Sequence, residues 1–241
     1  MTIAVSAVLF DLDGTLVDPA GGITDGIAHA LETLGLPALP QETLDSMIGP
    51  KLADAMVQIA GVPANLVPEA VAIYRRHYRE NGIPASRVYP GIVPALQALQ
   101  AAGVRLGVAT QKPEPLAKVL LAHHGLDRHF DVICGSSADE TLMPGDPGYR
   151  SGKQGIIAAA LQSLGTDNAA MVGDRHQDVR GATANSLNCI GVGWGFAADG
   201  ELEAAGAAAV VKNTAELLAA LSTLPAHRPN SFSLEAAHGA L

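Results

Sequence analysis

Residues 11–18 read Asp-Leu-Asp-Gly-Thr-Leu-Val-Asp, the most informative stretch of the chain. It follows an apolar run at 4–10, which is typical of a strand buried on both faces of a sheet. Two carboxylates two residues apart then meet a glycine, where the chain must turn. At the carboxyl edge of a sheet, this arrangement can present one side chain as a nucleophile and another as a proton donor. Aspartates that only cap a helix or shape a turn are the plainer alternative.

The composition narrows the class of protein. A chain of 241 residues suits one core domain with a sizeable insertion, or two small domains. The net charge of −9 gives no electrostatic reason to expect a nucleic acid or an anionic membrane as partner. We see no signal peptide, and no apolar run approaches the roughly 18 residues of a membrane helix. Cys134 and Cys189 lack metal-ligand spacing, so we expect reduced core thiols in a cytoplasmic protein.

The chain between residues 18 and 88 has the pattern of helices. Apolar residues recur at helical spacing over 23–35, over 42–60 with an interruption near 48–50, and over 68–78, with Gly and Pro at the turns. No convincing strand lies between 20 and 88. The segment 18–88 is therefore predicted to be a compact helical bundle inserted into another domain.

From Tyr89 onward, helices alternate with short apolar strands. The strands are expected at 104–110, 131–134, 169–174, 189–192 and 208–211. Repeated strand–helix units imply a parallel sheet with helices on both faces. We therefore predict an α/β core from residues 1–17 and 89–224. The polar tail at 225–241 is expected to be disordered or an interaction arm.

Asp11, Thr110 and Asp174 each stand where an apolar strand ends. Ligands of open α/β sheets bind outside the carboxyl ends of the strands, so these side chains should converge. Together with Asp13 and Asp178 they place up to four carboxylates in one region, which is unstable unless some are protonated or a cation is bound. Oxygen ligands of this kind fit Mg²⁺ best. A metal ion, a lysine and a threonine hydroxyl together suit a phosphoryl group.

Four motifs make the chain resemble the haloacid dehalogenase superfamily of phosphohydrolases over nearly its whole length. They occur in the family's order: DxDGT at 11–15, the strand-end Thr110, Lys153 near a helix start, and GDxxxD at 173–178. The resemblance implies a Rossmann-like parallel-sheet core. It also implies that residues 18–88 are an inserted helical cap domain of the family's first type. The link at 139–152 is longer than the family's usual one.

The resemblance implies a role for each matching residue. Asp11 would attack phosphorus and form an aspartyl phosphate, and Asp13 would first protonate the leaving group and then deprotonate water. Lys153 would offset the negative charge. Substrate contacts are implied at Gly14, Thr110 and Gln111, and at Lys51 in the cap. The Mg²⁺ ligands would be Asp11, the main-chain carbonyl of Asp13, Asp174 and Asp178.

Some of these positions have a purely structural alternative. Lys51 and Lys153 can be solvated helix lysines, and Asp178 can be only a helix cap. Lys112 suits either a phosphate contact or a solvated helix start. Arg175 and the residue that follows it are expected to be solvated or at the rim of the site.

Within the superfamily, the chain resembles the phosphoglycolate phosphatase and 5′-nucleotidase-like set. The implied function is Mg²⁺-dependent hydrolysis of a small phosphorylated metabolite by a monomer or homodimer. The dehalogenase branch fits least, because its chemistry works without the second motif aspartate, and Asp13 is present. Phosphomutase activity, transfer of a phosphoryl group to or from protein, and a non-catalytic regulatory module remain alternatives. No nucleotide-binding loop of the GxxxxGK[ST] type favours a kinase.

Overall fold

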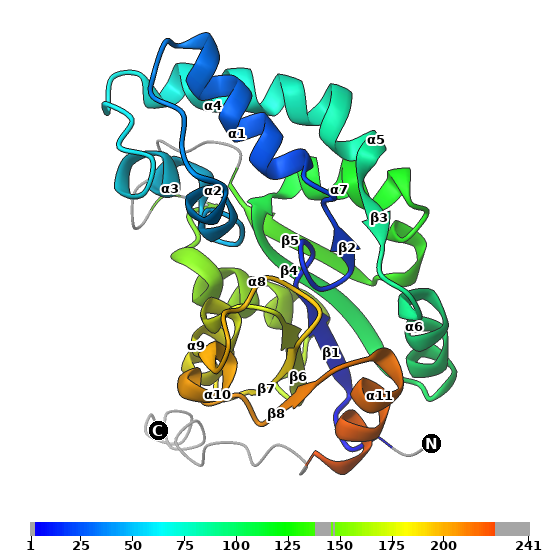
Figure 1. The fold of residues 1–241 in the computed structure, drawn as a ribbon. Helices are drawn as coiled ribbons and strands as arrows, with labels where there is room; N and C mark the ends of the chain where they lie inside the picture. The colour runs from blue at the N-terminus through cyan, green and yellow to red at the C-terminus, as the bar shows by residue number, and fades with distance from the viewer. Residues whose placement is uncertain (1–2, 138–145, 147, 225–241) are drawn as a thin grey trace, which may run out of the picture.

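The computed structural model describes residues 3–137, 146 and 148–224. In this part of the chain, a parallel six-stranded sheet has the order β5-β4-β1-β6-β7-β8 (Figure 1). Its strands are β1 (Ala7–Phe10), β4 (Arg105–Pro113), β5 (Val132–Ser136), β6 (Ala169–Gly173), β7 (Asn188–Val192) and β8 (Ala209–Val211). Strand β1 is central, with Ala7 paired to Arg105 on one side and to Ala169 on the other. The predicted α/β parallel sheet is confirmed.

Helices cover both faces of this sheet, which explains the continuous apolar run of β1. Val8 and Phe10 pack on the face covered by α6 (Ile92–Ala101), α7 (Glu114–His123) and α11 (Thr214–Thr223). Ala7 and Leu9 point to the other face, toward α8 (Gly152–Leu164), α9 (His176–Ala184) and α10 (Glu201–Ala205). Successive residues of a strand face opposite sides, so each side of β1 needs apolar residues.

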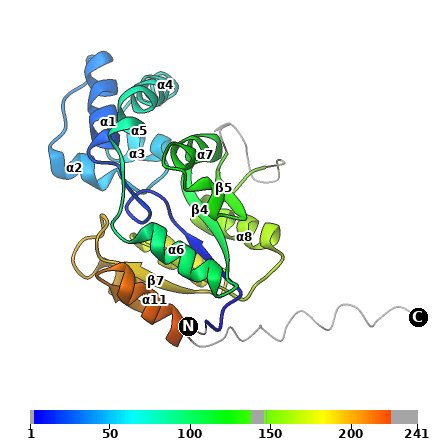
Figure 2. The same ribbon diagram turned by 90° about the vertical axis from the view of Figure 1, so that its right-hand side faces the viewer.

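The helices of the N-terminal third form a separate group over the carboxyl end of the sheet (Figures 1 and 2). They are α1 (Gly22–Thr33), α2 (Gln41–Ser46), α3 (Leu52–Gln58), α4 (Val67–His77), the π-helical turn η1 (Tyr78–Gly82) and α5 (Ile83–Ala85). The helical stretch expected over 42–60 is two helices, α2 and α3, separated as predicted near 48–50 by a loop in which Gly49 has a φ of 106°. We call residues 18–88 the cap, as the sequence suggested.

A short ribbon joins the cap to the sheet. Strand β2 (Val17–Asp18) pairs antiparallel with β3 (Arg87–Val88), where the chain leaves the core and returns to it. The expectation of no strand between 20 and 88 was therefore wrong for β3. Two residues are too few to show an alternating pattern in the sequence. Both predicted domain boundaries fall at this ribbon.

Strand β4 is longer than expected. It was predicted to end at Thr110, but its pairing with β5 continues, after an irregularity, to Pro113 and Ser136. Helix α7 begins at Glu114. Lys112 therefore lies in the strand, which excludes one of the two alternatives left open for it, a solvated residue at a helix start.

The remaining predictions concern the cysteines, membrane-spanning helices, the tail and the 139–152 link. Cys134 and Cys189 are free and buried, as predicted. Within the described residues, no helix is long and apolar enough to cross a membrane. The predicted tail at 225–241 and most of the link at 139–152 lie outside the described residues.

We predict that Gly82→Ala destabilises the cap. The backbone of Gly82 is helical, with φ −69° and ψ −45°, so alanine would be favoured there by helix propensity alone. A Cβ at this position, however, would lie 2.5 Å from the ring of Tyr78 and 3.1 Å from the carbonyl oxygen of Gly22. We expect urea denaturation to show a loss of about 2 kcal/mol in unfolding free energy. The exposed Glu80→Ala in the same turn is the control. Equal or higher stability of Gly82→Ala would contradict the packing argument.

Candidate active site

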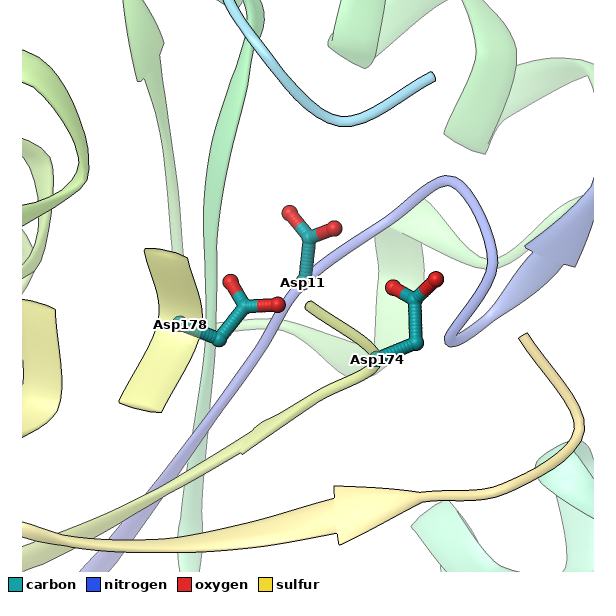
Figure 3. A group of neighbouring side chains, drawn as sticks. All are labelled: Asp11, Asp174 and Asp178. Carbon is teal, nitrogen blue, oxygen red and sulfur yellow. The ribbon is translucent and has the colours of Figure 1, made fainter. Parts of the chain in front are cut away.

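A buried lysine joins two carboxylates at the carboxyl end of the sheet. Asp11 follows β1, Lys153 is the second residue of α8, and Asp178 lies in the first turn of α9. The Lys153 Nζ lies 2.5 Å from Asp11 Oδ1 and 2.5 Å from Asp178 Oδ1. All three side chains are at most 8% exposed. Figure 3 shows that the carboxylates of Asp11, Asp174 and Asp178 point toward a common region. A solvated Lys153 is excluded by this burial.

Asp174 is held by the loops around it. Its Oδ1 accepts a hydrogen bond from the Thr15 hydroxyl at 3.1 Å, and its Oδ2 accepts one from the Phe196 amide at 2.9 Å. Side chains at Gly14 or Gly195 would collide with the Asp174 carboxylate. Gly14 also has a φ of 84°, and its amide donates to the Val17 carbonyl at 2.9 Å. The structure thus gives Gly14 a role in the turn, and its predicted contact with substrate stays a prediction.

Burial and mutual repulsion shift the protonation of this cluster. Burial raises the pKa of Asp174 well above its usual value, and the nearby Asp11 and Asp178 raise it further. Burial also raises the pKa of Asp178 to about 6, although Lys153 opposes this. Desolvation favours a neutral Lys153, but the two carboxylates outweigh it and raise the pKa of that lysine. One lysine therefore does not fully neutralise the three carboxylates.

The three carboxylates have the geometry of a cation site. One oxygen from each of Asp11, Asp174 and Asp178 lies within 4.8 Å of the others. Hard divalent cations prefer oxygen ligands, and a bound cation would relieve the repulsion that raises the pKa of Asp174. The residues present fit Mg²⁺. Asp178 is also a helix cap, because its Oδ2 accepts the Arg175 amide at 3.0 Å, so both roles considered for it are compatible.

A cavity of about 60 Å³ lies between this cluster and the cap. Its lining contains five of the predicted catalytic and substrate-binding residues: Asp11, Asp13, Thr110, Gln111 and Lys51. Lys153 instead borders a neighbouring open pocket, which it shares with Gln111. The cavity lining also contains Lys112, for which a phosphate contact was one of two alternatives, and Arg75 and Tyr74, which the sequence did not predict as functional residues. Arg75 lies in the stretch predicted to be helical at 68–78, and only the position of α4 shows that it borders the cavity.

Two core side chains hold the cap loop over the cavity. Gln111 Nε2 donates to the Gly49 carbonyl at 2.7 Å, and an Arg175 guanidinium nitrogen donates to the Ile48 carbonyl. Arg175 also pairs with Glu201 at 3.0 Å. Of the two alternatives expected for Arg175, a solvated side chain is excluded, because the cap loop and α10 both contact it. His176 likewise contacts Glu201, at 2.9 Å.

Lys112 forms a second buried ion pair at the site. Its Nζ lies 2.8 Å from Asp13 Oδ2. Burial raises the pKa of Asp13 above its usual value, and Lys112 opposes that rise. Burial favours a neutral Lys112, but Asp13 outweighs this effect and raises the pKa of the lysine. In this structure Lys112 thus contacts the predicted proton donor.

We predict that the contribution of Glu201 to stability depends on pH. Burial alone would raise its pKa, but hydrogen bonds from His176, Arg175 and the Ala198 amide lower it to about 2. A carboxylate with a depressed folded-state pKa stabilises the fold above its unfolded pKa of about 4.3, and this contribution disappears as the pH falls toward 2. The unfolding free energy of wild type should therefore exceed that of Glu201→Gln at pH 6 and approach it near pH 2.5. A difference that does not change with pH would contradict the assignment.

Comparison with known proteins agrees with this geometry. The sequence pattern of the haloacid dehalogenase-like hydrolases matches residues 8–192. A 5′-nucleotidase of Pseudomonas aeruginosa is 40% identical over 199 residues, which cover 82% of this chain and 86% of that protein. A phosphoglycolate phosphatase of Cupriavidus necator is 34% identical over 227 residues, covering 92% and 95%. The tyrosine-protein kinase PtkA of Mycobacterium tuberculosis is 39% identical over 191 residues, which cover 78% of this chain but 62% of that protein.

Solved structures show the same fold. The crystal structure of a protein from Clostridium acetobutylicum, described as a predicted phosphatase, has a TM-score of 0.80 and 37% sequence identity. The match covers 88% of this chain and 96% of that one. The sequence match, the sheet order and the buried aspartate cluster agree, and the chain belongs to the haloacid dehalogenase-like hydrolases, among the phosphatases of that family.

Proposed function

We propose that the protein is a Mg²⁺-dependent phosphatase that hydrolyses a small phosphomonoester through an aspartyl phosphate on Asp11. The observation that carries the proposal is the position of Asp11. Its carboxylate lines the cavity, pairs with Lys153 at 2.5 Å, and lies within 4.8 Å of Asp174 and Asp178. A nucleophile that attacks an anionic phosphoryl group needs neighbouring positive charge, which Lys153 and a bound Mg²⁺ would supply together.

In the first step, an oxygen of Asp11 forms a bond to phosphorus and the bond from phosphorus to the leaving oxygen breaks. The electron pair stays on the leaving oxygen, which takes a proton from the carboxyl group of Asp13. Burial raises the pKa of Asp13, which favours the protonated form that this step needs. Thr110, buried in the cavity lining, would orient the phosphoryl oxygens.

In the second step, water attacks phosphorus and the bond from Asp11 to phosphorus breaks. The water gives its proton to the Asp13 carboxylate, and the Asp11 carboxylate is regenerated. The cap loop held by Gln111 and Arg175 would exclude other water from the cavity. Asp13 thus returns to its starting state after each turnover.

The Mg²⁺ would be held by the carboxylates of Asp11 and Asp174 and the main-chain carbonyl of Asp13, with Asp178 as ligand or support. When bound, this ion supplies positive charge that offsets the negative charge of the phosphoryl group and of the aspartates. Lys153, which contacts both Asp11 and Asp178, would hold the Asp11 carboxylate in place.

The size of the cavity favours a small substrate. Its volume of about 60 Å³ is room for about four to six water molecules, which suits a compact ester such as phosphoglycolate better than a nucleotide. Lys51 is in its lining, so the leaving group can carry a negative charge. Two relatives are named 5′-nucleotidase and phosphoglycolate phosphatase, and both kinds of ester belong in a substrate screen.

We predict that Asp11→Asn abolishes phosphate release. The protein would be assayed with phosphoglycolate, nucleoside monophosphates, sugar phosphates and p-nitrophenyl phosphate, with Mg²⁺ or with EDTA. Wild type should turn over at least one ester only with Mg²⁺, and kcat should fall at least about 1,000-fold in Asp11→Asn, because the amide cannot form the covalent intermediate. The control is Asp167→Asn, an exposed aspartate near the start of β6, at the far end of that strand. Wild-type turnover by Asp11→Asn would rule out the mechanism.

We also predict that Mg²⁺ stabilises the fold through Asp174. At about 100 times its Kd, Mg²⁺ should raise the Tm of wild type by about 5 °C or more, since it binds only the folded cluster. Asp174→Asn removes one charged ligand and should lose most of this shift, while Asp167→Asn keeps it. Thermal denaturation with Mg²⁺ or EDTA measures this without any substrate. An unchanged shift in Asp174→Asn would place the metal elsewhere.

A further inference from the structure

The ion pair between Lys112 and Asp13 is more deeply buried than charged groups usually are. The two side chains are 5% and 11% exposed, and their Nζ and Oδ2 atoms lie 2.8 Å apart. Taking both charges out of water costs several kcal/mol, so a buried pair of this kind is weak evidence for stability alone. Asp13 is the proton donor and acceptor of the proposed mechanism, which makes this lysine a candidate for a functional role.

The cap supplies the other contact of Lys112. Its Nζ lies 4.3 Å from the centre of the Tyr78 ring, a distance typical of a cation–π contact. Tyr78 is fully buried at the start of η1, and its hydroxyl has no hydrogen-bond partner among the described residues. The ring also stacks on Tyr74 at 5.7 Å between centroids. The contact of Tyr78 with the site is therefore made by the face of its ring, and not by its hydroxyl.

The local backbone holds this ring in place. π-helical turns are uncommon and occur frequently at functional sites. In η1, Gly82 leaves space for the Tyr78 ring, because a Cβ at Gly82 would lie 2.5 Å from it. A Cβ at Gly22, on α1, would also lie 2.5 Å from the Gly82 backbone. The close approach of α1 and η1 thus fixes Tyr78 over Lys112.

The result is a defined orientation of Asp13. Its Oδ2 is held by Lys112, whereas its Oδ1 is buried and has no hydrogen-bond partner among the described residues. Asp13 also lines the cavity. Oδ1 is therefore the carboxylate oxygen that Lys112 leaves without a partner.

We propose that Lys112 and the ring of Tyr78 are positioning residues for Asp13, through which the cap orients the proton donor. This inference rests on the proposed phosphatase function. In the first step, Asp13 gives its proton to the leaving oxygen and becomes a carboxylate, which Lys112 holds until water returns a proton to it. Lys112 itself keeps its protons throughout. The cap thereby contributes to catalysis as well as covering the cavity.

A comparison of two leaving groups tests this role. An aryl phosphate such as p-nitrophenyl phosphate departs without protonation, whereas an alkyl phosphate needs the proton from Asp13. We expect Lys112→Met to lower kcat/KM for the best alkyl ester of the screen about 10- to 100-fold more than for p-nitrophenyl phosphate. Lys118→Met, which removes an exposed lysine of α7, is the matched control and should lower neither.

Two variants of Tyr78 distinguish the contribution of its ring from that of its hydroxyl. Tyr78→Phe should keep the alkyl-to-aryl ratio of kcat/KM near that of wild type. Tyr78→Leu should lower this ratio, as Lys112→Met does. Circular dichroism and the Mg²⁺-induced Tm shift would establish that each variant is folded. If Lys112→Met does not fold, Tyr78→Leu and Lys112→Arg provide the comparison.

Two outcomes would overturn the positioning role. Equal losses for alkyl and aryl esters, expressed mainly in KM, would mean that Lys112 binds the substrate. An unchanged ratio in both Lys112→Met and Tyr78→Leu would mean that the pair is only structural. Either result leaves the phosphatase proposal intact, because wild type would still turn over both esters. Absence of turnover by wild type itself would instead contradict the proposed function.

Discussion

The contact of Lys153 with Asp11 and Asp178 is the interaction on which the site depends. Three carboxylates stand within 4.8 Å of one another in the protein interior, where water cannot screen their repulsion. A single buried ammonium group, 2.5 Å from two of them, holds the carboxylates in this arrangement. The remaining negative charge is what makes the cluster suited to a divalent cation. The electrostatic strain of the folded protein and its capacity to bind a metal thus have the same origin.

The cap also contacts the residues of the site. Three of its contacts with the core lie at the site: Gln111 with the Gly49 carbonyl, Arg175 with the Ile48 carbonyl, and Lys112 with the Tyr78 ring. The first two hold a loop over the cavity, and the third touches the partner of Asp13. Covering the site and orienting its proton donor would then be one event.

Sequence reasoning was most accurate where a pattern has only one structural solution. The apolar strand before Asp11 was predicted because a strand buried on both faces needs uninterrupted apolar residues. It was less decisive for Lys112, which was left open between a phosphate contact and a solvated helix start, and for Arg175, which was expected to be solvated or at the rim. The structure excludes a solvated side chain in both cases, because Lys112 lies in β4, which continues past Thr110, and because the cap loop and α10 cover Arg175. The segments that bury these two side chains are distant in the chain, so the neighbouring sequence does not indicate the burial.

The sequence by itself determined the α/β fold, the inserted helical segment and the residue types that meet at one edge of the sheet. These follow from local periodicity and from strand ends, which each segment carries in its own residues. Only the tertiary structure decided which charges pair, which oxygen of Asp13 remains free, and how small the cavity is. Those properties depend on distances of a few ångströms between residues far apart in the chain, such as Asp11 and Lys153, which are separated by 142 positions. Packing of the whole chain sets such distances, because no single segment contains both partners.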